Sequence, residues 1–366
     1  LAVGLLFGLA ATMRTEALVY ALVTTLVVGV LLLRHRRRLG AIVRFGGLVA
    51  AGLLLMLVAN QVVERLTVGG SIRSGRAANT AAAVGADVVL RVKEALTTTI
   101  GFNHWADGTD WFLGGLAVAL LGYGAWRLLG RDRNGRFLGL AAVAGAGLVY
   151  VTRFDARLGF IPGLLTASPL AVVGLFLAWR DRSFSRYRAV ALLALPIVFL
   201  FQYQGGAHAQ WGGRYVLTSG TLLVVAGALV VARSIGWGRI VVVGVAVAVT
   251  ACGVVWLSQR THAMADGFRT IVARHDQIVI SEAAFLLREG GAFYDVDSHW
   301  LSGMTKADTR RAIGVARKSG ATEFALLVPE GESRPREIDG FVRRGSQRID
   351  FPGLETLAVT YVRAGA

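Results

Sequence analysis

The chain has 366 residues, of which 54% are hydrophobic and only 17% charged, and its formal net charge is +16. Soluble globular proteins carry about 25% charged residues, so this composition favours a membrane protein. The positive charge alone would suggest nucleic-acid binding. The distribution of the arginines excludes it, because they occur in short clusters between apolar runs and not along one polar face.

The start of the chain and its single cysteine narrow the class further. Cys252 lies inside an apolar run, which excludes a disulfide framework. The chain opens at Leu1 in the middle of a hydrophobic run, without the basic segment and cleavage site of a signal peptide. We therefore expect a fragment whose N-terminal part, together with some catalytic residues, is missing.

Apolar runs dominate the first 260 residues. A helix needs about 20 apolar residues to cross the hydrocarbon core of a bilayer, and nine runs reach or approach this length. Lipid cannot satisfy open strand edges, so the backbone within these runs is expected to be helical. The runs are 1–13, 16–33, 41–60, 111–129, 137–152, 160–179, 189–203, 215–232 and 239–257. They predict a polytopic α-helical membrane domain over residues 1–260.

Arginines gather in every second loop between these runs, after the second, fourth, sixth and eighth. The positive-inside rule places such loops in the cytoplasm. The other loops, among them a long one at 61–110 and the stretch 204–214, are then expected outside the plasma membrane. Within the long loop, residues 86–100 predict an amphipathic helix that lies on the membrane surface.

The last part of the chain, 261–366, has ordinary charge density and alternates strand and helix patterns. This predicts a small α/β domain on the extracytoplasmic side. The expected elements are strands at 277–281, 323–328 and 354–363 and helices at 282–289 and 306–320. No glycine-rich phosphate loop follows the first strand, which argues against a nucleotide site.

A glycine-rich polar island at 204–215 holds His208, Trp211, Arg214 and Tyr215 at the expected outer interface. An arginine directly before a span on that side is contrary to the charge rule. A lipid phosphate would explain it, because a guanidinium can donate to two phosphate oxygens at once. The alternative is that the aromatic residues belong to an interfacial belt and that Arg214 is a snorkelling anchor.

Three further polar clusters lie on the expected outer side. They are Arg14 with Glu16, Arg153 with Asp155 and Arg157, and His104 with Asp107 and Asp110. Each has a structural alternative: helix ends, a solvated loop, and caps or turns, respectively. The third cluster has a spacing that would suit a divalent metal, although we assign no metal or other cofactor. Its aspartates are also the acids nearest the membrane, and glycosyl transfer needs a carboxylate base.

The apolar runs themselves carry almost no charge; Arg44 lies near a cytoplasmic end. Pumps and ion-coupled transporters need ionisable groups within the membrane. The polar chemistry of this chain is therefore expected at the outer face, as in an enzyme that acts on lipid-linked substrates.

Two stretches resemble a known family. GLLFGLAATMRTEA (4–17) is similar to the G-x-x-x-G-L-A-x-x-x-R-x-E-A stretch of GT-C membrane glycosyltransferases, in the branch of the polyprenyl-phosphate-mannose protein mannosyltransferases and lipid A aminoarabinose transferases. WGGRYVLT (211–218) resembles their W-x-x-R-Y-x-x-P stretch, with Thr218 where proline is common. Residues 161–179 and a C-terminal outer α/β domain also fit this type.

The resemblance implies transfer of a sugar from a polyprenyl-phosphate donor at the outer leaflet to a hydroxyl of a glycan, lipid or protein acceptor. It implies a catalytic Asp or Glu in a loop upstream of Leu1, so the catalytic residue of this fragment is unassigned. The implied substrate-binding residues are Arg14, Glu16, His208, Trp211, Arg214 and Tyr215. The two arginines would neutralise the donor phosphate.

Two other classes of function remain open. A lipid or polysaccharide transporter would carry an inverted repeat and helices broken at mid-depth, and the sequence shows neither. A non-catalytic membrane scaffold would use the C-terminal domain to bind partners.

Overall fold

The computed structural model describes most of the chain, with fourteen segments left out. These are residues 15, 37, 69–87, 104–106, 131–132, 155–159, 202–215, 284–285, 288–289, 291–297, 304, 332–333, 352–353 and 366. The chain forms two compact units, Leu1–Gly253 and Val254–Ala366, and the boundary lies inside one long helix.

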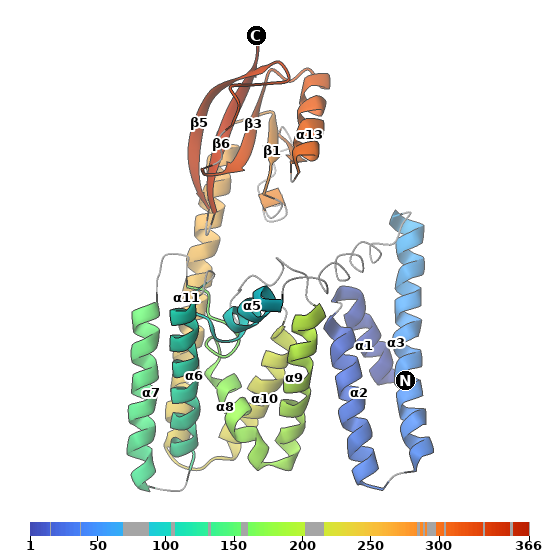
Figure 1. The fold of residues 1–366 in the computed structure, drawn as a ribbon, viewed down its shortest axis with the longest axis vertical. Helices are drawn as coiled ribbons and strands as arrows, with labels where there is room; N and C mark the ends of the chain where they lie inside the picture. Colours follow the sequence, from blue (N-terminus) through green and yellow to red (C-terminus); the bar gives the residue numbers. More distant parts are fainter. Residues whose placement is uncertain are drawn as a thin grey trace. The chain divides into compact units, whose positions relative to one another are not determined.

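The first unit is built from helices. They are α1 (Ala2–Met13), α2 (Glu16–Arg34), α3 (Leu39–Val68), α5 (Val88–Ile100), α6 (Gly108–Leu128), α7 (Arg133–Arg153), α8 (Pro169–Leu177) with the 3₁₀ turn η1 (Ala178–Arg180), α9 (Arg182–Phe201), α10 (Leu217–Arg233) and α11 (Gly238–Val272). Figure 1 shows the turns α2–α3, α6–α7, η1–α9 and α10–α11 at one end of this unit. We call it the arginine end, and the opposite end, where α5 lies, the α5 end.

Six of the described helices, namely α2, α3, α6, α7, α9 and α11, are long and apolar enough to cross a membrane. Three shorter apolar helices cover Ala2–Met13, Pro169–Arg180 and Leu217–Arg233. Large apolar side chains are exposed on the outside of the unit; on α3, for example, Leu54 is 56% and Leu55 60% exposed. Such a surface suits lipid and not water, so the predicted polytopic helical architecture agrees with the structure.

The prediction of a helical run over 160–179 is wrong for its first half. Residues 160–168 are not helical, and α8 begins only at Pro169. Proline is favoured at the first helical position, and the Ser168 side chain caps the helix by accepting a hydrogen bond from the Ala171 amide at 3.3 Å. The sequence therefore breaks the helix that its hydropathy alone predicts.

The backbone amides of this segment form their hydrogen bonds with another part of the protein and not within a helix. The amides of Ile161, Gly163 and Leu164 donate to the carbonyls of Phe102, Gly101 and Thr98 at 2.7, 2.9 and 2.8 Å. All of these groups belong to buried residues. Irregular backbone at the end of an apolar bundle is tolerated when protein covers it in this way.

The shortened helix α8 packs very closely against α10. A Cβ atom on Gly174 would overlap with the Leu223 carbonyl oxygen, and one on Gly227 would overlap with the Leu170 carbonyl oxygen. Small residues of this kind let helix backbones approach each other where no hydrophobic effect drives association.

A buried series of hydrogen bonds joins three helices of the bundle. The Tyr20 hydroxyl of α2 lies 2.8 Å from the Ser219 hydroxyl of α10, which donates to the Ala191 carbonyl of α9 at 2.9 Å. These hydroxyl and carbonyl groups are therefore paired with one another within the protein, as an apolar environment requires.

The second unit contains a six-stranded sheet in the order β2-β1-β3-β6-β5-β4. The elements after α11 are β1 (Ile278–Ser281), β2 (His299–Ser302), α13 (Lys306–Lys318), β3 (Glu323–Pro329), β4 (Glu337–Ile338), β5 (Phe341–Phe351) and β6 (Leu354–Arg363). β1 pairs in parallel with β2 and β3, and the other pairs are antiparallel.

The three predicted strands and the helix at 306–320 are confirmed to within two residues. The predicted helix at 282–289 falls partly outside the described residues. Strands β2, β4 and β5 were not predicted. β5 carries the sequence FVRRGSQRIDF and is exposed on both faces from Val342 to Arg348, so it lacks the alternation that identifies a half-buried strand.

Two layers of side chains hold the sheet. Ile313 and Ala316 of α13 pack with Phe324 on one face, whereas Phe268 and Ile271 of α11 pack on the other. At the end of α11, Arg274 donates from Nε to Asp276 at 2.7 Å and from Nη2 to the Thr360 hydroxyl of β6 at 2.6 Å. This largely buried ion pair connects the helix to the sheet.

We predict that Gly174→Ala destabilises the helical unit, because the added methyl group has no space between α8 and α10. Overpacking of this kind costs about 1–3 kcal/mol. Gly147 of α7 is the matched control, since a Cβ atom there meets nothing within 4 Å. Gly147→Ala should leave the melting temperature of the full chain in detergent unchanged or raise it. Equal melting temperatures for the two variants would contradict the close packing.

Candidate functional site

Five of the residues that the sequence singled out are described, and all lie at helix ends on the α5 end of the unit. They are Arg14, Glu16, Asp107, Asp110 and Arg153. The others lie outside the described residues: His104, Asp155, Arg157, His208, Trp211, Arg214 and Tyr215. The structure therefore shows the surroundings of the predicted polar island but not the island itself.

Arg14 and Glu16 flank the turn between α1 and α2. Arg14 is the C-cap residue of α1, and its amide donates to the Ala10 carbonyl at 2.8 Å. Glu16 is the first residue of α2, where a carboxylate interacts favourably with the positive end of the helix dipole. The helix-end roles given above as the alternative are thus present, and the Arg14 side chain is exposed at this end.

Asp107 and Asp110 organise the start of α6. Asp107 is the N-cap residue, and its Oδ1 accepts from the Asp110 amide at 2.8 Å. Asp110 is only 2% exposed. Its Oδ2 accepts from the Phe102 amide at 2.8 Å and the Asn103 amide at 3.3 Å, and its Oδ1 accepts from the Asn103 side chain at 3.1 Å. Both carboxylates therefore hold the α5–α6 connection in place.

These contacts leave the Asp110 carboxylate little capacity for a metal ion. Among the described residues, no group of three His, Cys, Asp or Glu side chains is placed to hold one.

Arg153 ends α7 beside an aromatic cluster. Its Nε atom is buried and has no hydrogen-bond partner among the described residues. In this cluster Phe102 meets Tyr150 edge to face, with ring centroids 5.0 Å apart, and stacks on Phe160 at 5.9 Å. Phe154 packs edge to face on Phe160 at 5.2 Å. Arg153 and these aromatic rings lie at the same end of the unit.

Two further charged residues at this end were not singled out from the sequence. Arg91 of α5 donates from Nη1 to the carbonyls of Phe199 and Leu200 in the last turn of α9. Glu64, in the last turns of α3, accepts from the Asn60 side chain at 2.7 Å through Oε1. Its Oε2 is buried, and no described residue bonds to it. The sequence signal for Arg91 was a cation on a helix expected at the outer surface, and for Glu64 a lone acid just beyond an apolar run.

At the arginine end, one acidic residue, Asp181, is bound by neighbouring residues. Asp181, in the loop before α9, accepts from the Ser183 amide at 2.7 Å and pairs with Arg233. The hydrogen bonds from Ser183, followed by the charge of Arg233, lower the pKa of Asp181 from its ordinary value. Arg233 also lies over the Phe184 ring at 4.3 Å.

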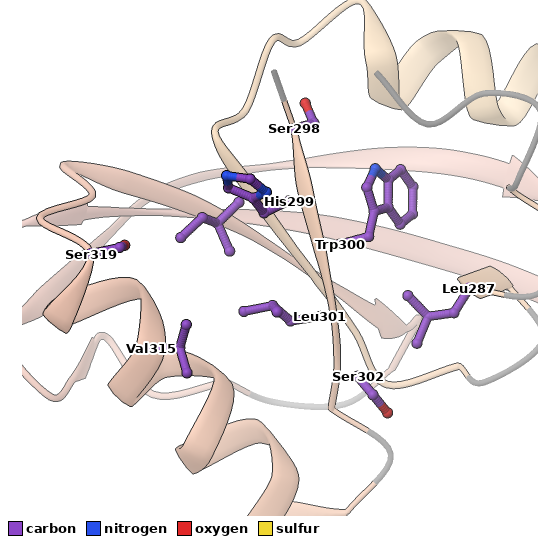
Figure 2. A pocket seen from close by; sticks show the side chains of 9 residues that line it. Leu287, Ser298, His299, Trp300, Leu301, Ser302, Val315 and Ser319 are labelled. Carbon is purple, nitrogen blue, oxygen red and sulfur yellow. The ribbon is translucent and has the colours of Figure 1, made fainter. Parts of the chain in front are cut away.

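The second unit has a cavity of about 640 Å³ beside its edge strand β2. Figure 2 shows His299 and Leu301 on the side of β2 that faces Val315 and Ser319 of α13, and Trp300 on the other side. The lining is mostly apolar, with His299 and three serines among its polar residues.

Comparisons of the chain with protein-family models, curated proteins and solved structures found no match. The candidate site is therefore defined by position and chemistry: polar and cationic side chains at the α5 end of a bundle of apolar helices. Such a group can bind an anion at the boundary between lipid and water.

We predict that Asp110→Ala lowers the free energy of unfolding by about 1–3 kcal/mol, because the buried donors of Phe102 and Asn103 lose their acceptor. Asp107→Ala removes a helix cap and should cost about 1 kcal/mol. Thermal unfolding of the full chain, with hydrogen exchange at the Phe102 amide, measures both. A fall in the melting temperature of the unmodified chain on adding EDTA would instead indicate that these aspartates bind a metal.

Proposed function

We propose that this protein is an integral membrane glycosyltransferase of the GT-C type. It transfers a sugar from a polyprenyl-phosphate donor to a glycan, lipid or protein acceptor. In this proposal the α5 end faces outward from the plasma membrane and the arginine end faces the cytoplasm. The second unit then lies on the extracytoplasmic side.

The observation that carries the proposal is the presence of several arginines at the α5 end of the helical unit, which is opposite the arginine end. Arg14, Arg91 and Arg153 all lie at the α5 end, where positive charge is disfavoured unless an anion balances it. In the sequence, the polar island with Arg214 follows α9, whose last turn lies at this end. A lipid phosphate at the interface is an anion that these guanidinium groups can bind.

The chemistry of glycosyl transfer explains why fixed cations would help. As the bond between the sugar and the phosphate breaks, negative charge grows on the departing phosphate. A cation held in place stabilises this charge more in the transition state than in the ground state, so it raises the rate and not only the affinity. Trp211 and Tyr215 would contact the sugar or the prenyl chain, and His208 an oxygen of the phosphate or acceptor.

The interruption of the apolar run at 160–179 gives little support to the transporter alternative. Broken helices in transporters expose their free backbone groups to a substrate cavity. Here the amides of Ile161, Gly163 and Leu164 are bonded to carbonyls of the α5–α6 region instead. The scaffold alternative predicts no sugar transfer, so the transfer assay described below also tests it.

We predict that Arg214→Ala, made in the full-length protein, lowers transfer from a radiolabelled polyprenyl-phosphate sugar by about 100-fold or more in membrane vesicles. Loss of one preorganised charge stabiliser has an effect of this order. Arg186→Ala is the matched control, because Arg186 is exposed in α9 near the arginine end and should not contact the donor.

Unchanged turnover in Arg214→Ala at normal expression would remove the assigned role of this residue. Absence of transfer by the unmodified protein with every donor would contradict the proposed function.

A further inference from the structure

Arg91 is held in an unusual way for a surface arginine of an amphipathic helix. Its Nη1 atom donates to the Phe199 carbonyl at 3.0 Å and also to the Leu200 carbonyl. Both carbonyls belong to the last turn of α9, where backbone acceptors have no partner within the helix. The negative end of the helix dipole also favours a cation there. The end of α9 therefore fixes the position and plane of this guanidinium.

The other edge of the same guanidinium is not used. Nε and Nη2 of Arg91 are buried, and in the part of the chain that the structure describes they have no hydrogen-bond partner. Glu94, the nearest acid along α5, lies one turn away, and no hydrogen bond joins it to Arg91 in the described structure. Charged donors that are cut off from both water and acceptors are costly, so this edge is suited to an additional ligand.

The geometry of the free edge selects the ligand class. Nε–H and one N–H of Nη2 are parallel donors that match two oxygens of a single phosphate or carboxylate group. Since Nη1 is already bound, the ligand must approach along this edge, and its two oxygens can bond to the protein at the same time.

The surroundings of Arg91 favour a phosphate that belongs to a lipid. Its neighbours Val88, Val89 and Val92 on α5 are 71%, 61% and 52% exposed. A short helix with exposed valines beside a cation, at the end of apolar spans, suits the boundary between headgroups and acyl chains. The phosphate groups of membrane lipids lie at this depth.

We propose that the Nε–Nη2 edge of Arg91, fixed by the C-terminal carbonyls of α9, binds a phosphate group carried by a membrane lipid. The identity of that lipid as a polyprenyl phosphate rests on the proposed function. In this proposal α5 positions the headgroup of that lipid.

The test measures binding of farnesyl phosphate to the purified full-length protein in neutral detergent by tryptophan fluorescence. Farnesol, which lacks the phosphate, and inorganic phosphate, which lacks the chain, are the comparison ligands. Arg91→Lys keeps the charge and one donor to α9 but cannot form the two-pronged contact. Lys93→Ala is the matched control, since Lys93 is an exposed cation on the same helix.

We expect Arg91→Lys to weaken farnesyl phosphate binding at least tenfold and Lys93→Ala to change it less than twofold, with farnesol unaffected by either. Inorganic phosphate binding that is as strong and equally dependent on Arg91 would support the site but assign it to free phosphate. Equal affinity of the unmodified protein for farnesyl phosphate and farnesol would overturn the proposal. This comparison remains decisive if the variant does not fold.

Unchanged farnesyl phosphate binding in a folded Arg91→Lys protein would also overturn it. The inference and the proposed function fail separately. If the protein binds farnesyl phosphate through Arg91 but transfers no sugar, the proposed binding site is supported and the proposed enzymatic function is not. If Arg91→Lys changes neither sugar transfer nor farnesyl phosphate binding, the proposed enzymatic function stands and the proposed binding site does not.

Discussion

The helical unit depends on one constraint: in an apolar environment every backbone amide and carbonyl must find its partner within the protein. Helices meet this requirement along most of the chain. At 160–168, where the chain is not helical, the carbonyls of Thr98, Gly101 and Phe102 provide the partners instead. The buried chain from Tyr20 through Ser219 to Ala191 applies the same rule to side chains. The charged side chains described above lie near the two ends of the helical unit.

The sequence allowed most of this architecture to be predicted, because hydropathy and length determine where lipid-facing helices form. The failures have local physical causes. A run of apolar residues cannot distinguish a continuous helix from one that starts late at Pro169, since both bury the same side chains. Strand β5 escaped prediction because its middle is exposed on both faces, so pairing with β6 and not burial makes it a strand.

The candidate site was less predictable, since its key contacts join distant parts of the chain. The capping role of Asp107 could be anticipated from its place before a helix. Asp110 holds backbone amides seven and eight residues upstream, and no spacing rule identifies such a contact. Arg91 depends on carbonyls more than 100 residues later, at the end of α9. Only the fold shows that this arginine is fixed in place and that one edge of it is unused.

The central claim is that the α5 end, with its cations, faces the outside of the cell. The most direct measurement places a single cysteine at Lys93 or at Arg186, after replacement of Cys252 by serine, and treats intact cells with a membrane-impermeant maleimide. Both positions are exposed, on α5 and near the arginine end of α9 respectively. The account predicts labelling of Lys93→Cys in intact cells and of Arg186→Cys only after permeabilisation. The reverse pattern would contradict it.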